Sequence, residues 1–129
     1  MLAIALADSG RFDEAWRCIG QSMAAIEATK ERWCEAEAHR VAGEIALKSP
    51  ERDVAKAQAY FEHSLIAARA QQAKSWELRA ATSLARLLSS QGKRQTARDL
   101  LAPLYGWFTE GFETSDLLKA KALLGELHQ

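Results

Sequence analysis

Hydrophobic residues recur at steps of three and four along nearly the whole chain, which is the spacing of an amphipathic helix. The stretch that carries Phe12, Ala15 and Ile19 is typical. The pattern breaks at residues that commonly end helices, such as Gly10 and Pro50. The sequence therefore predicts an all-α protein whose helices span seven ranges: 2–9, 12–28, 31–48, 52–72, 76–91, 93–109 and 115–127.

Two residues make more specific predictions about helix geometry. Ser75 directly precedes the range 76–91 and is a residue type that caps helix N-termini, so we expect it to be the N-cap. Pro103 falls inside the range 93–109, where its ring removes one backbone hydrogen bond. We expect this helix to bend there.

A short motif occurs three times and divides the chain into repeats. Its shared small residues are Ala15, Ala57 and Ala97, at intervals of about 40 residues, and a bulky residue follows four positions after each. Small side chains let helix axes approach closely, while larger neighbours fill the groove between successive helix pairs. A helical repeat array follows, in a single domain over 1–129: a partial first repeat 1–29, a second repeat 30–73, a third repeat 74–111 and a capping helix 114–127.

Net charge and cysteine content indicate which kinds of partner and which cellular compartment to expect. The 129 residues include 17 basic and 17 acidic side chains, so the formal net charge is zero. A neutral chain has no overall attraction to nucleic acid or to an anionic membrane. Cys18 and Cys34 fit small buried hydrophobic positions in a reducing compartment. We therefore expect a cytoplasmic protein that binds neither nucleic acid nor membrane.

The sequence shows no arrangement typical of catalysis or of metal binding. Serines and histidines occur without a nucleophile-elbow or Cys–His signature. Glu35 and His39 can share a helix face, but two ligands do not make a metal site. Lys93, Arg94 and Arg98 form a small basic patch, which we interpret as a solvated helix start. We predict no catalytic residue, no cofactor and no metal.

The repeated motif resembles the tetratricopeptide repeat. Gly10, Phe12, Ala15 and Ile19 match its second half, although the repeats are longer than the usual 34 residues of that family. The resemblance implies antiparallel helix pairs stacked into a right-handed solenoid, closed by a C-terminal capping helix.

A second, narrower resemblance concerns the segments 76–81 and 100–112. They are similar to the C-terminal end of large bacterial regulators. Those proteins join an adenylate-cyclase or helix-turn-helix DNA-binding domain to a signalling ATPase and then to such repeats. The resemblance implies a terminal sensor or scaffold segment, and we expect Met1 to fall partway through the first helix of an incomplete repeat. It does not imply cyclase or ATPase activity, because no residues here match those domains.

In tetratricopeptide arrays the first helix of each pair lines a concave groove. Arginine can hold a carboxylate through two parallel hydrogen bonds, so an acidic peptide or a carboxylate terminus is one candidate ligand. The alternative is a hydrated groove whose arginines pair with the chain's own glutamates. By helical register, the side chains expected to face the groove are Glu37, Arg40, Glu44, Arg79, Thr82 and Arg86.

Three hypotheses about function follow. The first is a non-enzymatic protein–protein interaction module of a bacterial signalling regulator, which binds a peptide or another domain of a longer parent chain. The second is a homodimer that covers the incomplete first repeat through Leu2 and Leu6. The third is a sensor that holds a small molecule between its helices.

Overall fold

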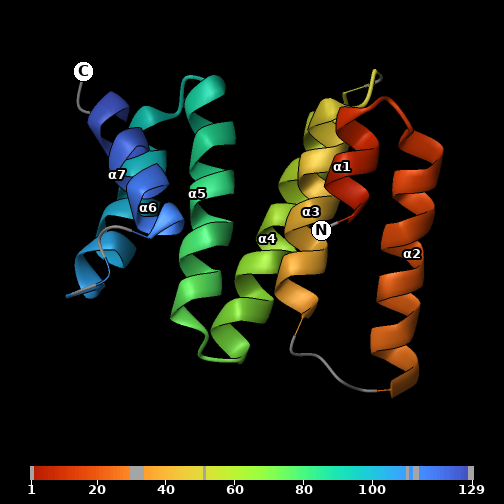
Figure 1. Ribbon diagram of the computed structural model, residues 1–129. Helices are drawn as coiled ribbons and strands as arrows, with labels where there is room; N and C mark the ends of the chain where they lie inside the picture. Colours follow the sequence, from red (N-terminus) through yellow and green to blue (C-terminus); the bar gives the residue numbers. More distant parts are fainter. Residues whose placement is uncertain (1, 30–33, 51, 110, 112–113, 128–129) are drawn as a thin grey trace.

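The computed structural model describes residues 2–29, 34–50, 52–109, 111 and 114–127. Within these ranges all regular structure is helical, so the predicted all-α class and the seven helices are confirmed (Figure 1). The helices are α1 (Leu2–Asp8), α2 (Phe12–Thr29), α3 (Glu35–Lys48), α4 (Val54–Ala70), α5 (Lys74–Ser90), α6 (Arg94–Trp107) and α7 (Ser115–Leu127).

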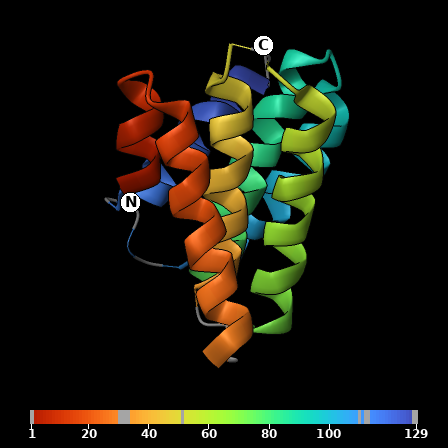
Figure 2. The ribbon, with the colours of Figure 1, turned by 90° about the vertical axis from the view of Figure 1, so that its right-hand side faces the viewer.

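The helices pack in two layers. Each helix contacts the next one along the chain and runs antiparallel to it. In addition, α1 contacts α3, α3 contacts α5, and α5 contacts α7. The helices α2 and α4 meet through side chains, with the ring centroids of Trp16 and Tyr60 6.1 Å apart. The odd-numbered helices therefore form one continuous layer, and the even-numbered helices lie behind it (Figures 1 and 2). A superhelical path and its handedness stay predictions.

Most helix boundaries lie within two residues of their predicted positions. Gly10 and Gly92 have φ angles of 82° and 79°, which explains why α1 and α5 end beside them. The Asp53 side chain accepts a hydrogen bond from the Lys56 backbone N–H at 3.0 Å and fixes the start of α4. Pro103 lies inside α6 as expected, and the bend stays a prediction.

The predicted cap at Ser75 is wrong. The helix α5 begins two residues earlier than predicted, at Lys74, and its N-cap is Ala73. The reason is the preceding turn: Gln72 adopts a φ of 54°, and the Ala73 N–H then bonds to the Ala68 carbonyl. This turn ends α4 and already places Lys74 in a helical position. The start of the predicted range 31–48 lies partly outside the described residues, at 31–33.

Small residues set the distance between helices, as the repeated motif predicts. Ala15, Ala57 and Ala97 are completely buried. Gly43 on α3 faces the ring of Phe61 on α4, and a Cβ atom built on it would lie 2.5 Å from Phe61 Cε1. The absence of a side chain at residue 43 thus allows the large ring to pack between the two helices.

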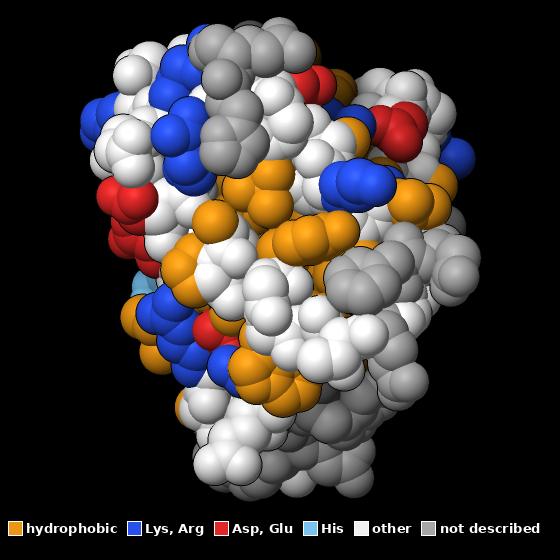
Figure 3. Space-filling model, turned by 90° about the vertical axis from the view of Figure 1, so that its left-hand side faces the viewer, with side chains coloured by type: hydrophobic (Ala, Val, Ile, Leu, Met, Phe, Trp, Pro, Cys, Tyr) orange, Lys and Arg blue, Asp and Glu red, His pale blue; other side chains and the backbone are white. Residues whose placement is uncertain are grey.

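The last helix covers the core with one face and leaves hydrophobic groups on another. Leu117, Ala120 and Leu123 are buried, whereas Leu118 is 53% exposed. The view of the end formed by α6 and α7 shows hydrophobic side chains gathered at the middle of this face (Figure 3). The outer surface of α7 is therefore not uniformly polar, and its role as a capping helix stays a prediction.

The basic patch at the start of α6 is not simply solvated, which corrects the interpretation from sequence. The guanidinium groups of Arg94 and Arg98 donate to the backbone carbonyls of Glu126 and Leu127, at the C-terminal end of α7. Cations are favourable there because the last carbonyls of a helix lack partners and carry partial negative charge. The two arginines therefore fasten α7 to α6.

Replacing Arg98 with methionine, which keeps an apolar stem, is expected to lower the free energy of unfolding by about 1–2 kcal/mol, because one charge-assisted hydrogen bond to α7 is lost. Chemical denaturation measures this difference. The matched control is Lys93→Met, since Lys93 is exposed just before α6. Equal stability losses in the two variants would show that Arg98 does not fasten α7.

Candidate functional site

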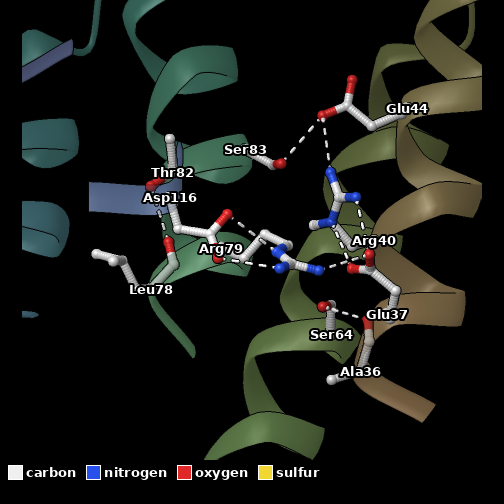
Figure 4. A network of polar contacts seen from close by, with 10 residues as sticks. All are labelled: Ala36, Glu37, Arg40, Glu44, Ser64, Leu78, Arg79, Thr82, Ser83 and Asp116. Atoms are coloured by element: carbon white, nitrogen blue, oxygen red, sulfur yellow. Dashed lines mark hydrogen bonds and ion pairs between the residues drawn. The ribbon is translucent and has the colours of Figure 1, made fainter. Parts of the chain in front are cut away.

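An ion-pair network joins the three helices α3, α5 and α7 (Figure 4). At its centre is Arg79 of α5, whose Nη1 lies 2.8 Å from Glu37 Oε2 on α3. The other edge of the same guanidinium faces Asp116 of α7, with Nε 3.2 Å from Oδ1 and Nη2 3.0 Å from Oδ2. One arginine thus holds carboxylates from both neighbouring helices.

The α3 part of the network follows from helical spacing. Glu37, Arg40 and Glu44 are three and four residues apart, so they lie on one face of the helix. Arg40 donates to both oxygens of Glu37, at 2.7 Å and 3.1 Å, and its Nη1 is 3.9 Å from Glu44 Oε1. Across to α5, the Ser83 hydroxyl donates to Glu44 Oε1 at 3.0 Å. Every acidic group of this network therefore has a donor.

Electrostatics favours the ionised forms. Burial alone would raise the pKa of Glu37, but the hydrogen bond and charge of Arg40, and then those of Arg79, hold that pKa below its ordinary value of 4.5. The hydrogen bond that Arg79 donates to Asp116 is the main reason that the pKa of Arg79 is raised, with opposition from burial and a further contribution from Glu37. Both shifts favour the charged forms of Glu37 and Arg79.

The network borders an open cleft of about 300 Å³ between α3, α5 and α7. Four residues expected to face a groove line this cleft: Arg40, Arg79, Thr82 and Arg86. Four further lining residues were not predicted: Ser83, Ser115, Asp116 and Lys119. Ser83 lies on α5, whose register the repeats define, but the three residues on α7 required knowledge of where α7 docks.

The predicted groove residues differ in what they can offer a ligand. Thr82 is buried and its hydroxyl donates to the Leu78 carbonyl at 2.8 Å, so its hydrogen is engaged within α5. Glu37 and Glu44 hold Arg40 in place and do not line the cleft. Arg86 is exposed and makes no ion pair with any described residue. The structure thus brings the predicted residues together but leaves only part of them accessible.

The face proposed for self-association is only partly described. The side chain of Leu2 lies outside the described residues. Leu6 is half-buried and packs against a core cluster that includes Ala3, Ala7 and Ile19. A substitution at Leu6 would therefore disturb the fold as well as any contact between two copies.

A pair of histidines connects α3 and α4 away from the cleft. The rings of His39 and His63 stack with centroids 5.5 Å apart, and Tyr60 lies 6.3 Å from His39. Glu35 Oε1 is 3.9 Å from His39 Nε2. Burial, and then the neighbouring His63, lower the pKa of His39 below 6.5, with Glu35 opposing. The folded protein therefore favours neutral His39.

We expect the free energy of unfolding to decrease as the pH falls below 6.5, because the unfolded chain binds a proton at His39 more readily than the folded chain does. The stabilisation that neutral His39 gives the folded protein is complete above pH 6.5. It is lost as the pH falls through the lowered pKa that His39 has in the folded state. Denaturation at about pH 7.5 and about pH 5.5 measures the loss. The loss of unfolding free energy between these two pH values should be smaller in His39→Gln. A loss of the same size in that variant would show that His39 does not cause it.

The described residues contain no group of three or more His, Cys, Asp or Glu side chains arranged to hold a metal ion. Over the same residues, no helix is both long enough and apolar enough to cross a membrane. The chain matches no protein-family model, no curated protein and no solved structure.

Proposed function

We propose that this chain is a protein–protein interaction module of the tetratricopeptide type, which acts by binding rather than by catalysis. In this proposal the odd-numbered helices are the first helices of successive pairs, and the pairs stack into a right-handed solenoid with α7 as the cap. The continuous contacts from α1 through α3 and α5 to α7 support it, because such arrays pack each repeat on its neighbours. The parent protein would be a cytoplasmic bacterial signalling regulator.

The observation that carries the proposal is the charged cleft on the layer of first helices. Its walls come from three successive odd-numbered helices, so it crosses the boundary between the second and third repeats and the boundary between the third repeat and the capping helix. Groups on packed helices are held more precisely than groups on loops, which favours specific recognition. Within the cleft, Arg86 of α5 and Lys119 of α7 are exposed cations from different helices. A partner that carries negative charge is the chemistry such a surface favours.

Charge reversal at the cleft tests this proposal. The protein is immobilised, and the proteins that it retains from a lysate of the source organism are quantified for the unchanged chain and for Arg86→Glu/Lys119→Glu. Both side chains are exposed, so we expect an intact fold and at least a tenfold loss of the specific partner.

The matched control is Lys121→Glu, which changes an exposed residue of α7 that does not line the cleft. Retention that falls equally in the control and in the double variant would contradict a partner site in the cleft. Retention only of the chain itself, with a doubled mass in solution, would favour the homodimer instead. A rise in thermal stability with a metabolite, and no retained protein, would favour the sensor.

A further inference from the structure

We propose that the cleft between α3, α5 and α7 binds a phosphate monoester group, held by Arg86 and Lys119. This inference rests on the proposed function, because it names the chemistry of a ligand for the same cleft. It differs from the carboxylate ligand considered from sequence, and the difference comes from which cations the structure leaves available.

The two arginines best placed to hold a carboxylate are already occupied. Arg40 donates through Nε and Nη2 to both oxygens of Glu37. Arg79 donates through Nε and Nη2 to both oxygens of Asp116 and through Nη1 to Glu37. These are two-pronged pairs with good geometry, which a single incoming carboxylate would have to break. A ligand gains more binding free energy from cations that have no ion-pair partner to give up.

Arg86 and Lys119 are such cations. Arg86 lies on α5 and Lys119 on α7, both are exposed, and both line the cleft. Neither forms an ion pair or a hydrogen bond with the residues that the structure describes. The Ser115 hydroxyl lines the same space and offers a further donor. Two cationic side chains without such a partner therefore line the same cleft from different helices.

The donors that stay available favour a phosphate monoester over a carboxylate. The acidic neighbours Glu37, Glu44 and Asp116 are each held by Arg40, Arg79 or Ser83, and none of them pairs with Arg86 or Lys119. A phosphate monoester carries a charge of about −1.5 to −2 near pH 7 and has three acceptor oxygens. Its three oxygens can accept hydrogen bonds from Arg86, Lys119 and the Ser115 hydroxyl together, whereas a carboxylate offers two oxygens. The volume of about 300 Å³ is sufficient for such a group.

Two sources could supply this group: a free phosphorylated metabolite, or a phosphorylated side chain of a partner protein. Both present the same phosphate oxygens to Arg86 and Lys119. They differ in whether peptide backbone on either side of the phosphate adds contacts along the layer of odd-numbered helices. The test therefore includes one probe of each kind.

The experiment is titration calorimetry on the whole chain with inorganic phosphate, free phosphoserine and a short phosphoserine peptide, each against acetate at equal ionic strength. We expect phosphate and phosphoserine to bind more tightly than acetate. Arg86→Gln and Lys119→Gln should each weaken phosphoserine binding about tenfold, since each removes one charge-assisted contact. Lys121→Gln, on the same helix but outside the cleft, should leave binding unchanged.

Tighter binding of the peptide than of free phosphoserine supports the proposal with a protein source, and equal binding supports it with a metabolite source. Phosphate that binds no better than acetate overturns it, as does phosphoserine binding that Lys121→Gln weakens as much as Arg86→Gln. Failure of the phosphate site can be distinguished from failure of the proposed function. Cleft-dependent capture of a protein without phosphate binding overturns only this inference, and phosphate binding without any captured protein overturns only the proposed function.

Discussion

Replacing Gly43 with valine is expected to lower the free energy of unfolding by about 3 kcal/mol, which is a large part of the total stability of an ordinary domain. A Cβ atom at this position would lie 2.5 Å from Cε1 and 2.7 Å from Cδ1 of Phe61. Phe61 is completely buried, so its ring cannot move aside without displacing other core residues. Chemical denaturation measures the loss, and Gly43→Ala should give a smaller loss of the same sign.

The chain offers a matched control in Gly20. This glycine is also helical, in α2, but nothing lies within 4 Å of a Cβ atom built on it. Gly20→Ala should therefore stabilise the protein by about 0.5–1 kcal/mol, because alanine is the better helix former. If Gly43→Ala stabilised the protein as much as Gly20→Ala does, the close approach of α3 and α4 would be disproved.

The second large effect is expected at Phe61 itself. Phe61→Ala should cost about 3–5 kcal/mol, because the substitution removes a buried ring and leaves a cavity that rigid helices fill only in part. The ring belongs to the cluster that also includes Leu65, Leu78 and Leu84, so the cavity would open between α3, α4 and α5. Thermal or chemical denaturation measures the cost.

Ile66, on the same helix, is the control for Phe61. It is 64% exposed, so Ile66→Ala should change the free energy of unfolding by less than about 0.5 kcal/mol. A loss at Phe61 no larger than the loss at Ile66 would mean that α4 does not bury the Phe61 ring.

Much of the fold could be predicted because its causes are local and repeated. Ala15, Ala57 and Ala97 mark the close contacts, and Gly10 and Gly92 mark helix ends where the backbone takes a positive φ. The cap at Ser75 could not be predicted in this way, since the geometry that decides it belongs to the turn at Gln72 that ends the previous helix.

The candidate site could be predicted only on the helices whose register the repeats define. Arg40, Arg79 and Arg86 follow from that register, and the structure places all three at one cleft. Asp116 is 37 residues away from its partner Arg79, on a helix outside the repeated motif, and no local pattern indicates that contact. Arg94 and Arg98 were misinterpreted for the same reason, because the carbonyls that they meet belong to α7.

Site-specific photo-crosslinking tests the central claim, that a partner occupies the cleft, most directly. One variant carries a photoreactive amino acid in place of Ser115, an exposed residue that lines the cleft, so that Arg86 and Lys119 stay in place. The other variant carries it in place of Ile66, an exposed residue of the opposite layer. In lysate of the source organism, the account predicts a discrete adduct of higher mass from position 115 and none from position 66. The same adducts from both positions, or no adduct from position 115, would contradict it.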